Sequence, residues 1–278
     1  MTSPSPQQLE SFQRLPSGRL VLFYEFSCAD AKATSAVRAA LAKLALEHNG
    51  ALRWASEEQE IMCGRIAHYQ MAASLHFASR DAARAFIESA GHRAATAACT
   101  ALQVAVLGEQ PRAVALISSV MARVLPHWPF DSTVETTEEP GVDVSTTMPT
   151  SKMIAAVRSH PDQNTPVVMI NWLKFKPGDG KAAYYRYGKV ALTTTHHLGA
   201  KLIFAARYQQ ILIGNGGDPG TGLWDEFALM QYPGRATFGR MAALRRYRRA
   251  LADREAGLAE YGQGLTVTRP AEEFVWRG

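Results

Sequence analysis

An internal repeat constrains this chain more than any other feature of its sequence. Residues 20–51 align without a gap on residues 169–200, an offset of 149 residues that places Gly50 on Gly199. Several aligned pairs are residues that recur by chance less easily than alanine: Phe26 with Phe175, Asp30 with Asp179, Lys32 with Lys181 and His48 with His197. A repeat of this length predicts two copies of one structural unit.

Each copy predicts the same order of elements. The first strand is a near-continuous apolar run, at 20–26 or 167–175, and both runs are too short for helices. A helix follows at 33–47 or 181–197, where Asp30 or Asp179 can cap the first turn and Gly50 or Gly199 can close the last. Two strands, a second helix and a final strand complete each copy, at 51–63, 71–77, 81–98 and 101–107, and at 200–213, 224–232, 236–258 and 265–268.

The order βαββαβ is that of the ferredoxin-like motif, a four-stranded antiparallel sheet with both helices on one face. The other face needs a cover, and two sheets in one chain can cover each other. We therefore predict an α+β fold in which tandem ferredoxin-like (βαββαβ) repeats form an intramolecular dimeric α/β barrel. The predicted domains are 1–125 and 149–278, with a Pro-, Thr- and Glu-rich linker at 126–148 and peripheral helices at 7–14, 112–124 and 151–158.

The composition is that of an ordinary folded protein. Hydrophobic residues make up 47% of the 278, and the formal charge of +5 is a mild excess for this length. The three cysteines form no C-x-x-C pair and no histidines have metal-ligand spacing, so we expect reduced thiols, no metal and no cofactor. Because no signal peptide and no apolar run of membrane length are present, the predicted location is cytoplasmic.

Several motifs of the second copy are similar to those of one bacterial family. They are the strand at 165–176, the aromatic helix start at 184–188, the His197-x-Gly-Ala junction, Trp224-Asp-Glu, Tyr232-Pro-Gly-Arg and the helix at 247–258. Over 151–270 the chain resembles a domain-of-unknown-function family of the dimeric α/β-barrel superfamily. The first copy resembles that family only in outline, and we interpret it as a degenerate copy.

The resemblance implies the fold and no particular reaction. The superfamily includes cofactor-free monooxygenases, polyketide cyclases, small lactone isomerases, haem enzymes and non-catalytic members. Within this chain, the polar and aromatic residues gather in the second copy, where Asn171 and Tyr187 align with Leu22 and Arg38 of the first. We therefore place the predicted pocket in the second copy.

Four residues are predicted to be catalytic. Burying an amide without a hydrogen-bond partner costs about 1–3 kcal/mol, so Asn171 needs a partner in a ligand or in the protein. Asn171 therefore either polarises a substrate carbonyl or is a satisfied structural amide. Glu226, among apolar strand neighbours, is either a general base with a raised pKa or an ion-pair partner of Arg207. His197 is either a second base or, like His48, a helix cap, and Tyr187 is either core packing or a hydroxyl in the pocket.

Only one of the adjacent His196 and His197 can face the interior, because neighbouring helix side chains diverge by about 100°. The remaining predicted residues bind substrate: Arg207, Tyr232, Arg254 and Trp224. The resemblance adds that Arg254 matches a recurring arginine of that family, which could bind an anionic group bidentately.

The sequence thus predicts a cofactor-free isomerase, cyclase, lyase or monooxygenase acting on a carbonyl-bearing or aromatic metabolite. The alternative is a non-catalytic small-molecule-binding or accessory protein on the same fold. The predicted partner is a small-molecule ligand, without nucleic acid or membrane, in an intramolecular pseudo-dimer and possible homo-oligomer.

A glycine-rich run and an arginine-rich run do not predict a phosphate-binding or a nucleic-acid-binding site. The glycine-rich loop at 214–222 joins two strands and lacks the Lys-Ser/Thr of a phosphate loop, so we predict a flexible hairpin. The arginines at 245–249 are soon followed by acidic residues, and the chain has no recognised nucleic-acid module. A solvated helix face is therefore predicted there.

Overall fold

The computed structural model describes residues 3–63, 68–109, 112–134, 155, 157–214 and 224–270. Within these residues, eight strands close into one antiparallel barrel. The first half of the chain supplies β1 (Leu20–Cys28), β2 (Gly50–Cys63), β3 (Met71–Phe77) and β4 (Cys99–Glu109). The second half supplies β5 (Val167–Phe175), β6 (Lys201–Ile213), β7 (Glu226–Tyr232) and β8 (Leu258–Pro270).

Both halves have the strand order of the ferredoxin-like motif. The first runs β4-β1-β3-β2 and the second runs β6-β7-β5-β8, with every pair antiparallel. The halves join where β2 pairs with β8 and β4 pairs with β6, which leaves the sheet without a free edge. The predicted fold class is confirmed: the chain folds as an intramolecular dimeric α/β barrel. The domain limits and the ancestral duplication stay predictions.

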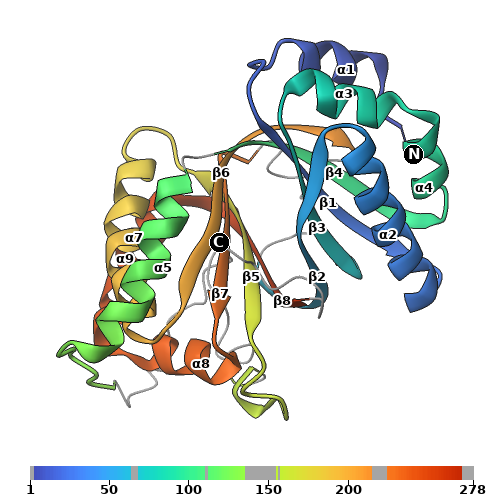
Figure 1. Cartoon of the computed structure of the whole chain (residues 1–278). Helices are drawn as coiled ribbons and strands as arrows, with labels where there is room; N and C mark the ends of the chain where they lie inside the picture. The colour runs from blue at the N-terminus through green and yellow to red at the C-terminus, as the bar shows by residue number, and fades with distance from the viewer. Residues whose placement is uncertain are drawn as a thin grey trace.

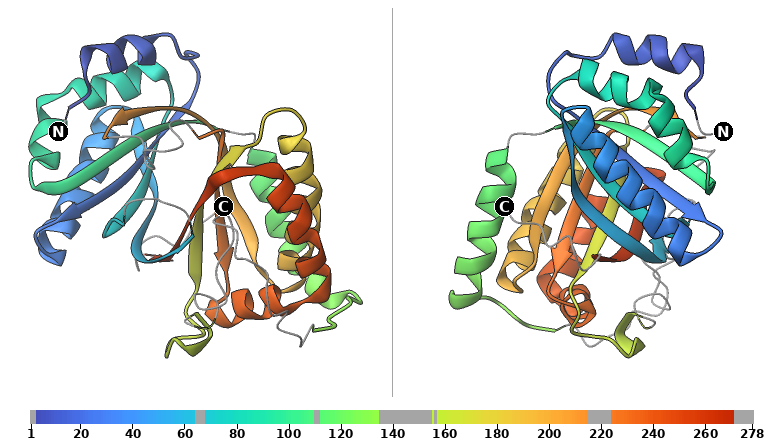
Figure 2. Two further views of the ribbon diagram at one scale, coloured as in Figure 1. Left: turned by 180° about the vertical axis from the view of Figure 1, so that it is seen from behind. Right: turned by 45° about the vertical axis from the view of Figure 1, so that its right-hand side comes forward.

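Helices cover the outside of the barrel in two separate layers (Figures 1 and 2). The first layer contains α1 (Pro6–Gln13), α2 (Ala31–Glu47), α3 (Arg80–Glu88) and α4 (Ala90–Thr96). The second layer contains α5 (Arg112–Val124), α7 (Gly180–His197), α8 (Arg235–Ala243) and α9 (Arg245–Gly257). Each layer covers the outer face of one four-stranded half, and the first layer also covers the end of β6, where Leu212 and Ile213 pack.

The inside of the barrel is a packed hydrophobic core. Phe23 and Trp54 of the first half and Trp172 and Phe227 of the second belong to one buried cluster. The Phe23 ring lies 4.5 Å from the Phe227 ring and stacks on Trp54. Side chains alternate along β5: Trp172 points into the barrel, whereas Leu173 packs on the helix side.

Helix ends follow the predicted pattern in part. The Asp30 carboxylate accepts a hydrogen bond from the Ala33 amide at 2.7 Å, whereas Asp179 makes no side-chain capping bond in the described residues. Gly199 closes α7 with a φ of 77°, but at the end of α2 the left-handed residue is Asn49, with a φ of 55°. Asparagine tolerates this conformation, and Gly50 instead opens β2.

The predicted second helix of each copy is wrong in length, because each is divided into two helices. Ser89 ends α3 in an extended conformation, and its hydroxyl accepts a hydrogen bond from the His92 amide in the first turn of α4. Leu244 is also extended and forms a β-bridge with Val134 between α8 and α9. The final strand β8 is longer than predicted because it pairs with both β2 and β5.

Some predicted segments lie outside the described residues. They are the linker from 135 to 148, most of the helix predicted at 151–158, and the hairpin loop from 215 to 222. The peripheral helices predicted at 7–14 and 112–124 are confirmed as α1 and α5.

Candidate functional site

The predicted site residues are spread along the helix layer of the second half. Helices α7 and α9 run antiparallel there, so the start of α7 lies beside the end of α9. Glu226 contacts the first turn of α7 through Lys181, whereas His197 ends that helix sixteen residues further on, a rise of about 24 Å. Glu226 and His197 therefore cannot act on the same substrate atom in this arrangement.

Asn171 is a half-buried amide with protein partners. Its side-chain nitrogen donates to the carbonyl of Met169 at 3.1 Å and to the carbonyl of Ala228, on the neighbouring strand β7, at 3.4 Å. This geometry fits the satisfied structural amide that the sequence left open. A catalytic role for Asn171 stays a prediction.

Glu226 is the most buried carboxylate of the predicted site, at 9% exposure. Its Oε1 accepts hydrogen bonds from the Lys181 ammonium and the Tyr185 hydroxyl, each at 2.7 Å. The predicted pairing with Arg207 is wrong: Arg207 lies opposite Glu226 in the β6–β7 register but is exposed, and the first turn of α7 supplies the cation instead.

The charge of Glu226 affects both of its partners. The hydrogen bond to this carboxylate raises the pKa of Lys181. Burial and then the hydrogen bond to Glu226 raise the pKa of Tyr185. Lys181 therefore stays cationic and Tyr185 stays neutral at physiological pH, and the arrangement is a hydrogen-bonded ion pair.

Tyr187, Tyr232 and Arg254 lie together in the core between the sheet and the helices. The hydroxyls of Tyr187 and Tyr247 are 2.9 Å apart, and the Arg254 guanidinium lies 5.7 Å from the Tyr187 ring centre. The Tyr232 hydroxyl donates to the sulfur of Met241 at 3.9 Å. Burial raises the pKa of Tyr232 and of Tyr247, so these phenols are neutral.

Trp224 lies on the opposite side of the sheet from Tyr232, another predicted substrate-binding residue. It packs inside the barrel, 6.3 Å from Trp172, whereas Met230 and Tyr232 pack on the helix side. The alternation fails because β7 begins only at Glu226, so Trp224 precedes the strand. Trp224 therefore does not lie beside Glu226 and Tyr232 on one strand face.

The adjacent histidines both have structural partners. His196 faces the interior, where its Nε2 lies 2.8 Å from the Ser118 hydroxyl and burial lowers its pKa. His197 is half-buried, its Nδ1 lies 2.7 Å from the Leu125 carbonyl, and its ring stacks on Phe130 at 4.5 Å. These contacts attach the short helix η1 (Leu125–His127) and the segment after it to the end of α7.

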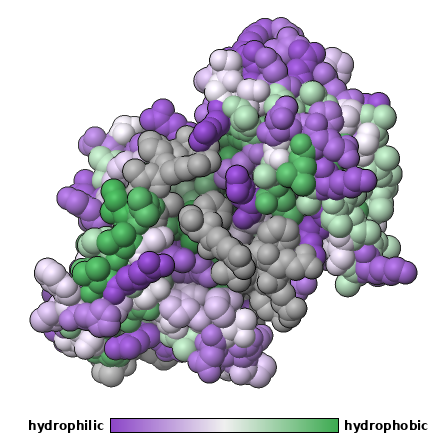
Figure 3. Space-filling model, viewed as in Figure 1, coloured by the Kyte–Doolittle hydropathy of each residue, from purple (hydrophilic) through white to green (hydrophobic). Residues whose placement is uncertain are grey.

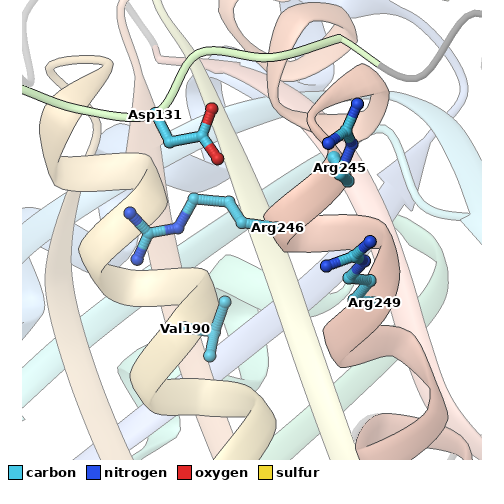
Figure 4. Close-up of a pocket in the computed structure, with 5 residues that line it drawn as sticks. All are labelled: Asp131, Val190, Arg245, Arg246 and Arg249. Carbon is cyan, nitrogen blue, oxygen red and sulfur yellow. The ribbon is translucent and has the colours of Figure 1, made fainter.

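That segment helps to form a pocket of about 390 Å³ between α7 and the start of α9 (Figure 4). In Figure 4, Arg246 extends from α9 toward α7 below Asp131, and Arg245 and Arg249 lie one turn apart on α9. We call this the α7–α9 pocket. Its lining residues are Asp131, Val190, Arg245, Arg246 and Arg249.

Asp131 is positioned by local hydrogen bonds. Its Oδ1 accepts the Thr133 amide at 3.0 Å and also the Thr133 hydroxyl, and these bonds lower the pKa of the carboxyl. The Thr133 carbonyl in turn accepts the Arg245 amide at 3.0 Å. The segment is thereby joined to the first turn of α9.

The α7–α9 pocket has a positive electrostatic character. Three arginines and one carboxylate line it, and the N-terminal end of α9 adds the positive end of its dipole. The residue before the helix, Leu244, has no side-chain oxygen that could cap the first-turn amides. An anion is the ligand that this combination favours.

Sequence reasoning missed this pocket. The solvated face predicted for the arginine run agrees with the exposure of Arg245 and Arg249, but their spacing also places both on the side of the helix that lines the pocket. The carboxylate comes from a segment more than one hundred residues away, so no local pattern connects it with the arginines. Among the described residues, no cluster of three His, Cys, Asp or Glu could hold a metal ion.

The strand order and the closed barrel define the fold: a dimeric α/β barrel formed within a single chain. No family model and no curated protein matches the sequence. Among the helices that the structure describes, none is long and apolar enough to cross a bilayer.

Solved structures with a similar fold include the RPA0582 protein of unknown function from Rhodopseudomonas palustris. It is 26% identical over 46% of this chain and 99% of its own, with a TM-score of 0.40. An anthrone oxidase-like protein is 10% identical over 94% of this chain and 97% of its own, with a TM-score of 0.46. A mutant chlorite dismutase from Candidatus Nitrospira defluvii is 12% identical over 94% and 95%, with a TM-score of 0.42.

Proposed function

We propose that this protein binds a small anionic molecule in the α7–α9 pocket. The observation that carries the proposal is the presence of three guanidinium groups around a pocket that contains one carboxylate. Guanidinium groups recognise carboxylates and phosphates through paired hydrogen bonds. A volume of about 390 Å³ also falls in the range of metabolite-sized ligand sites.

Binding is favoured over catalysis because three of the predicted catalytic residues have partners within the protein. Asn171, Glu226 and His197 each have protein partners, and none of them lines the pocket. The function supported best is therefore the alternative that the sequence offered, a non-catalytic small-molecule-binding protein on this fold.

A cofactor-free enzyme is the second candidate, and one observation favours it. The buried Glu226 carboxylate lies 2.7 Å from the hydroxyl of Tyr185, a side chain that is about half exposed. This pair could move a proton between the helix layer and a substrate at the surface. A carbonyl-bearing substrate would then be recognised outside the α7–α9 pocket.

Calorimetric titration with inorganic phosphate, pyrophosphate and malonate tests the binding proposal. An arginine that donates charged hydrogen bonds contributes about 1.5–3 kcal/mol, so Arg246→Gln should weaken binding of the preferred anion roughly tenfold or more. Arg186→Gln is the matched control, because Arg186 pairs with Asp253 on the same helix layer but does not line the pocket. Its anion affinity should match that of the wild type.

Two results would contradict the proposal. One is a wild-type protein that binds none of the three anions at low ionic strength, where surface charges are screened least. The other is an equal loss of affinity in Arg246→Gln and Arg186→Gln, which would indicate nonspecific attraction to a basic surface rather than a site.

A further inference from the structure

Helix α5 is oriented with its apolar residues toward solvent. Leu116 is 66% exposed and Ile117 is 62% exposed, whereas Ser118 and Ala122 are the buried ones among the side chains of α5 that the structure describes. We call the exposed apolar side chains of α5 and the following turn the α5 stripe: Val114, Leu116, Ile117, Val120, Val124 and Trp128. A surface helix normally turns such a face toward the core. Figure 3 shows hydrophobic residues gathered over this helix.

Buried polar contacts fix this orientation. The Ser118 hydroxyl accepts the Leu202 amide at 2.7 Å, where β6 begins, and lies 2.8 Å from Nε2 of His196. Turning the helix by half a revolution would leave these buried groups unpaired, at a cost of about 1–3 kcal/mol each. The small side chain of Ala122 also lets the helix lie close to the sheet. The exposure of the α5 stripe is therefore built into the fold.

We infer that the α5 stripe is a self-association surface, on which a second copy of this chain packs about a twofold axis. Six exposed apolar side chains present several hundred Å², roughly the largest patch that monomeric proteins expose. With a polar rim, this is about the 800 Å² that each partner contributes to a stable interface.

The charge distribution of α5 fits a copy of itself. The helix has no acidic residue, and its charged residues stand near its two ends, at 112 and 123. A face depleted of charge at its centre is typical of the core of a protein interface. Two α5 helices crossing near Val120 would pack Leu116 of one copy beside Val124 of the other, with opposed helix dipoles.

Sedimentation velocity of the full chain over a concentration series tests this inference. The wild type should sediment as a dimer, and Ile117→Glu should weaken its self-association roughly a hundredfold or more, because the interface would bury unpaired carboxylates. Leu46→Glu is the matched control, since Leu46 is 68% exposed on α2, outside the stripe. This control should remain a dimer.

A second variant keeps the test independent of folding. Ile117 and Val120 are both exposed on the surface of the monomer, so replacing either with glutamate should leave the fold intact. Val120→Glu should therefore cause the same loss of dimer while its circular dichroism spectrum stays unchanged. A wild type that stays monomeric throughout, or a dimer that both glutamate variants leave intact, would overturn the inference. A third result would also overturn it: a wild type that is monomeric in solution and binds anionic phospholipid vesicles, with that binding abolished by Ile117→Glu. The α5 stripe would then fit a membrane surface.

Discussion

Acid should destabilise this protein through one buried histidine of the first half. His92 is fully buried, and its Nε2 lies 2.9 Å from the Tyr24 hydroxyl. Its Nδ1 has no hydrogen-bond partner among the described residues. Burial, and then the nearby charge of Arg93, lower the pKa of His92 from 6.5 to about 4. The folded protein therefore holds this imidazole neutral.

The sign and size of the effect follow from that shift. Because the pKa is lower in the folded state, the unfolded chain takes up the proton first as the pH falls, so stability is complete above pH 6.5 and declines toward pH 4. Lowering the pKa of His92 from 6.5 to about 4 corresponds, at about 1.36 kcal/mol per pH unit, to about 3 kcal/mol of folding free energy in all. About 2 kcal/mol of this is lost by pH 5.

Urea unfolding at pH 7 and pH 5 measures this loss. His92→Gln cannot be protonated, so between these pH values the wild type should lose about 2 kcal/mol more of its free energy of unfolding than the variant. His127→Gln is the matched control, because His127 is exposed and should leave the wild-type pH dependence unchanged. The acid sensitivity of His196 is common to all three proteins and cancels. Equal losses in the wild type and His92→Gln would refute the role of His92.

Three further predictions test the packing. Gly257→Ala should destabilise the protein by about 1–3 kcal/mol in urea unfolding, because the new Cβ would lie 2.5 Å from the Tyr184 backbone nitrogen. Gly188 has open space around it on α7, so Gly188→Ala should stabilise the protein by up to about 1 kcal/mol. Phe23→Ala should cost about 3–5 kcal/mol by opening a cavity inside the barrel; a loss below 1 kcal/mol would count against a packed interior. Cys99 should react with iodoacetamide at pH 8 at least about a hundredfold more slowly in the folded protein than in urea, since burial raises its pKa to about 12; equal rates would contradict this.

The sequence determined two strands of the second half, β5 and β6, closely. Apolar runs predicted both almost to the residue, and the period-two alternation of a strand accounts for the separation of Trp172 from Leu173. It also predicted the cap of α2 at Asp30, because that interaction spans only three residues. These features depend on neighbours along the chain, so local spacing carries the information.

Contacts between distant segments were decided by the tertiary structure. One of the two alternatives for Glu226 was an ion pair with Arg207 on the adjacent strand, whereas packing of α7 brings Lys181 to this carboxylate. The break at Leu244 likewise depends on a bridge to Val134, more than one hundred residues earlier.

The α7–α9 pocket likewise combines a pattern visible in the sequence with contacts that only the tertiary structure makes. The sequence contained the arginine run as a visible pattern, but only the fold brings Asp131 and Val190 to it from two other segments. The periodicity of apolar side chains predicts which face of a helix or strand is buried, but it does not predict which other element covers that face. The pocket, the ion pair of Glu226 and the outward-facing α5 stripe all depend on that second choice, which packing and buried hydrogen bonds make together.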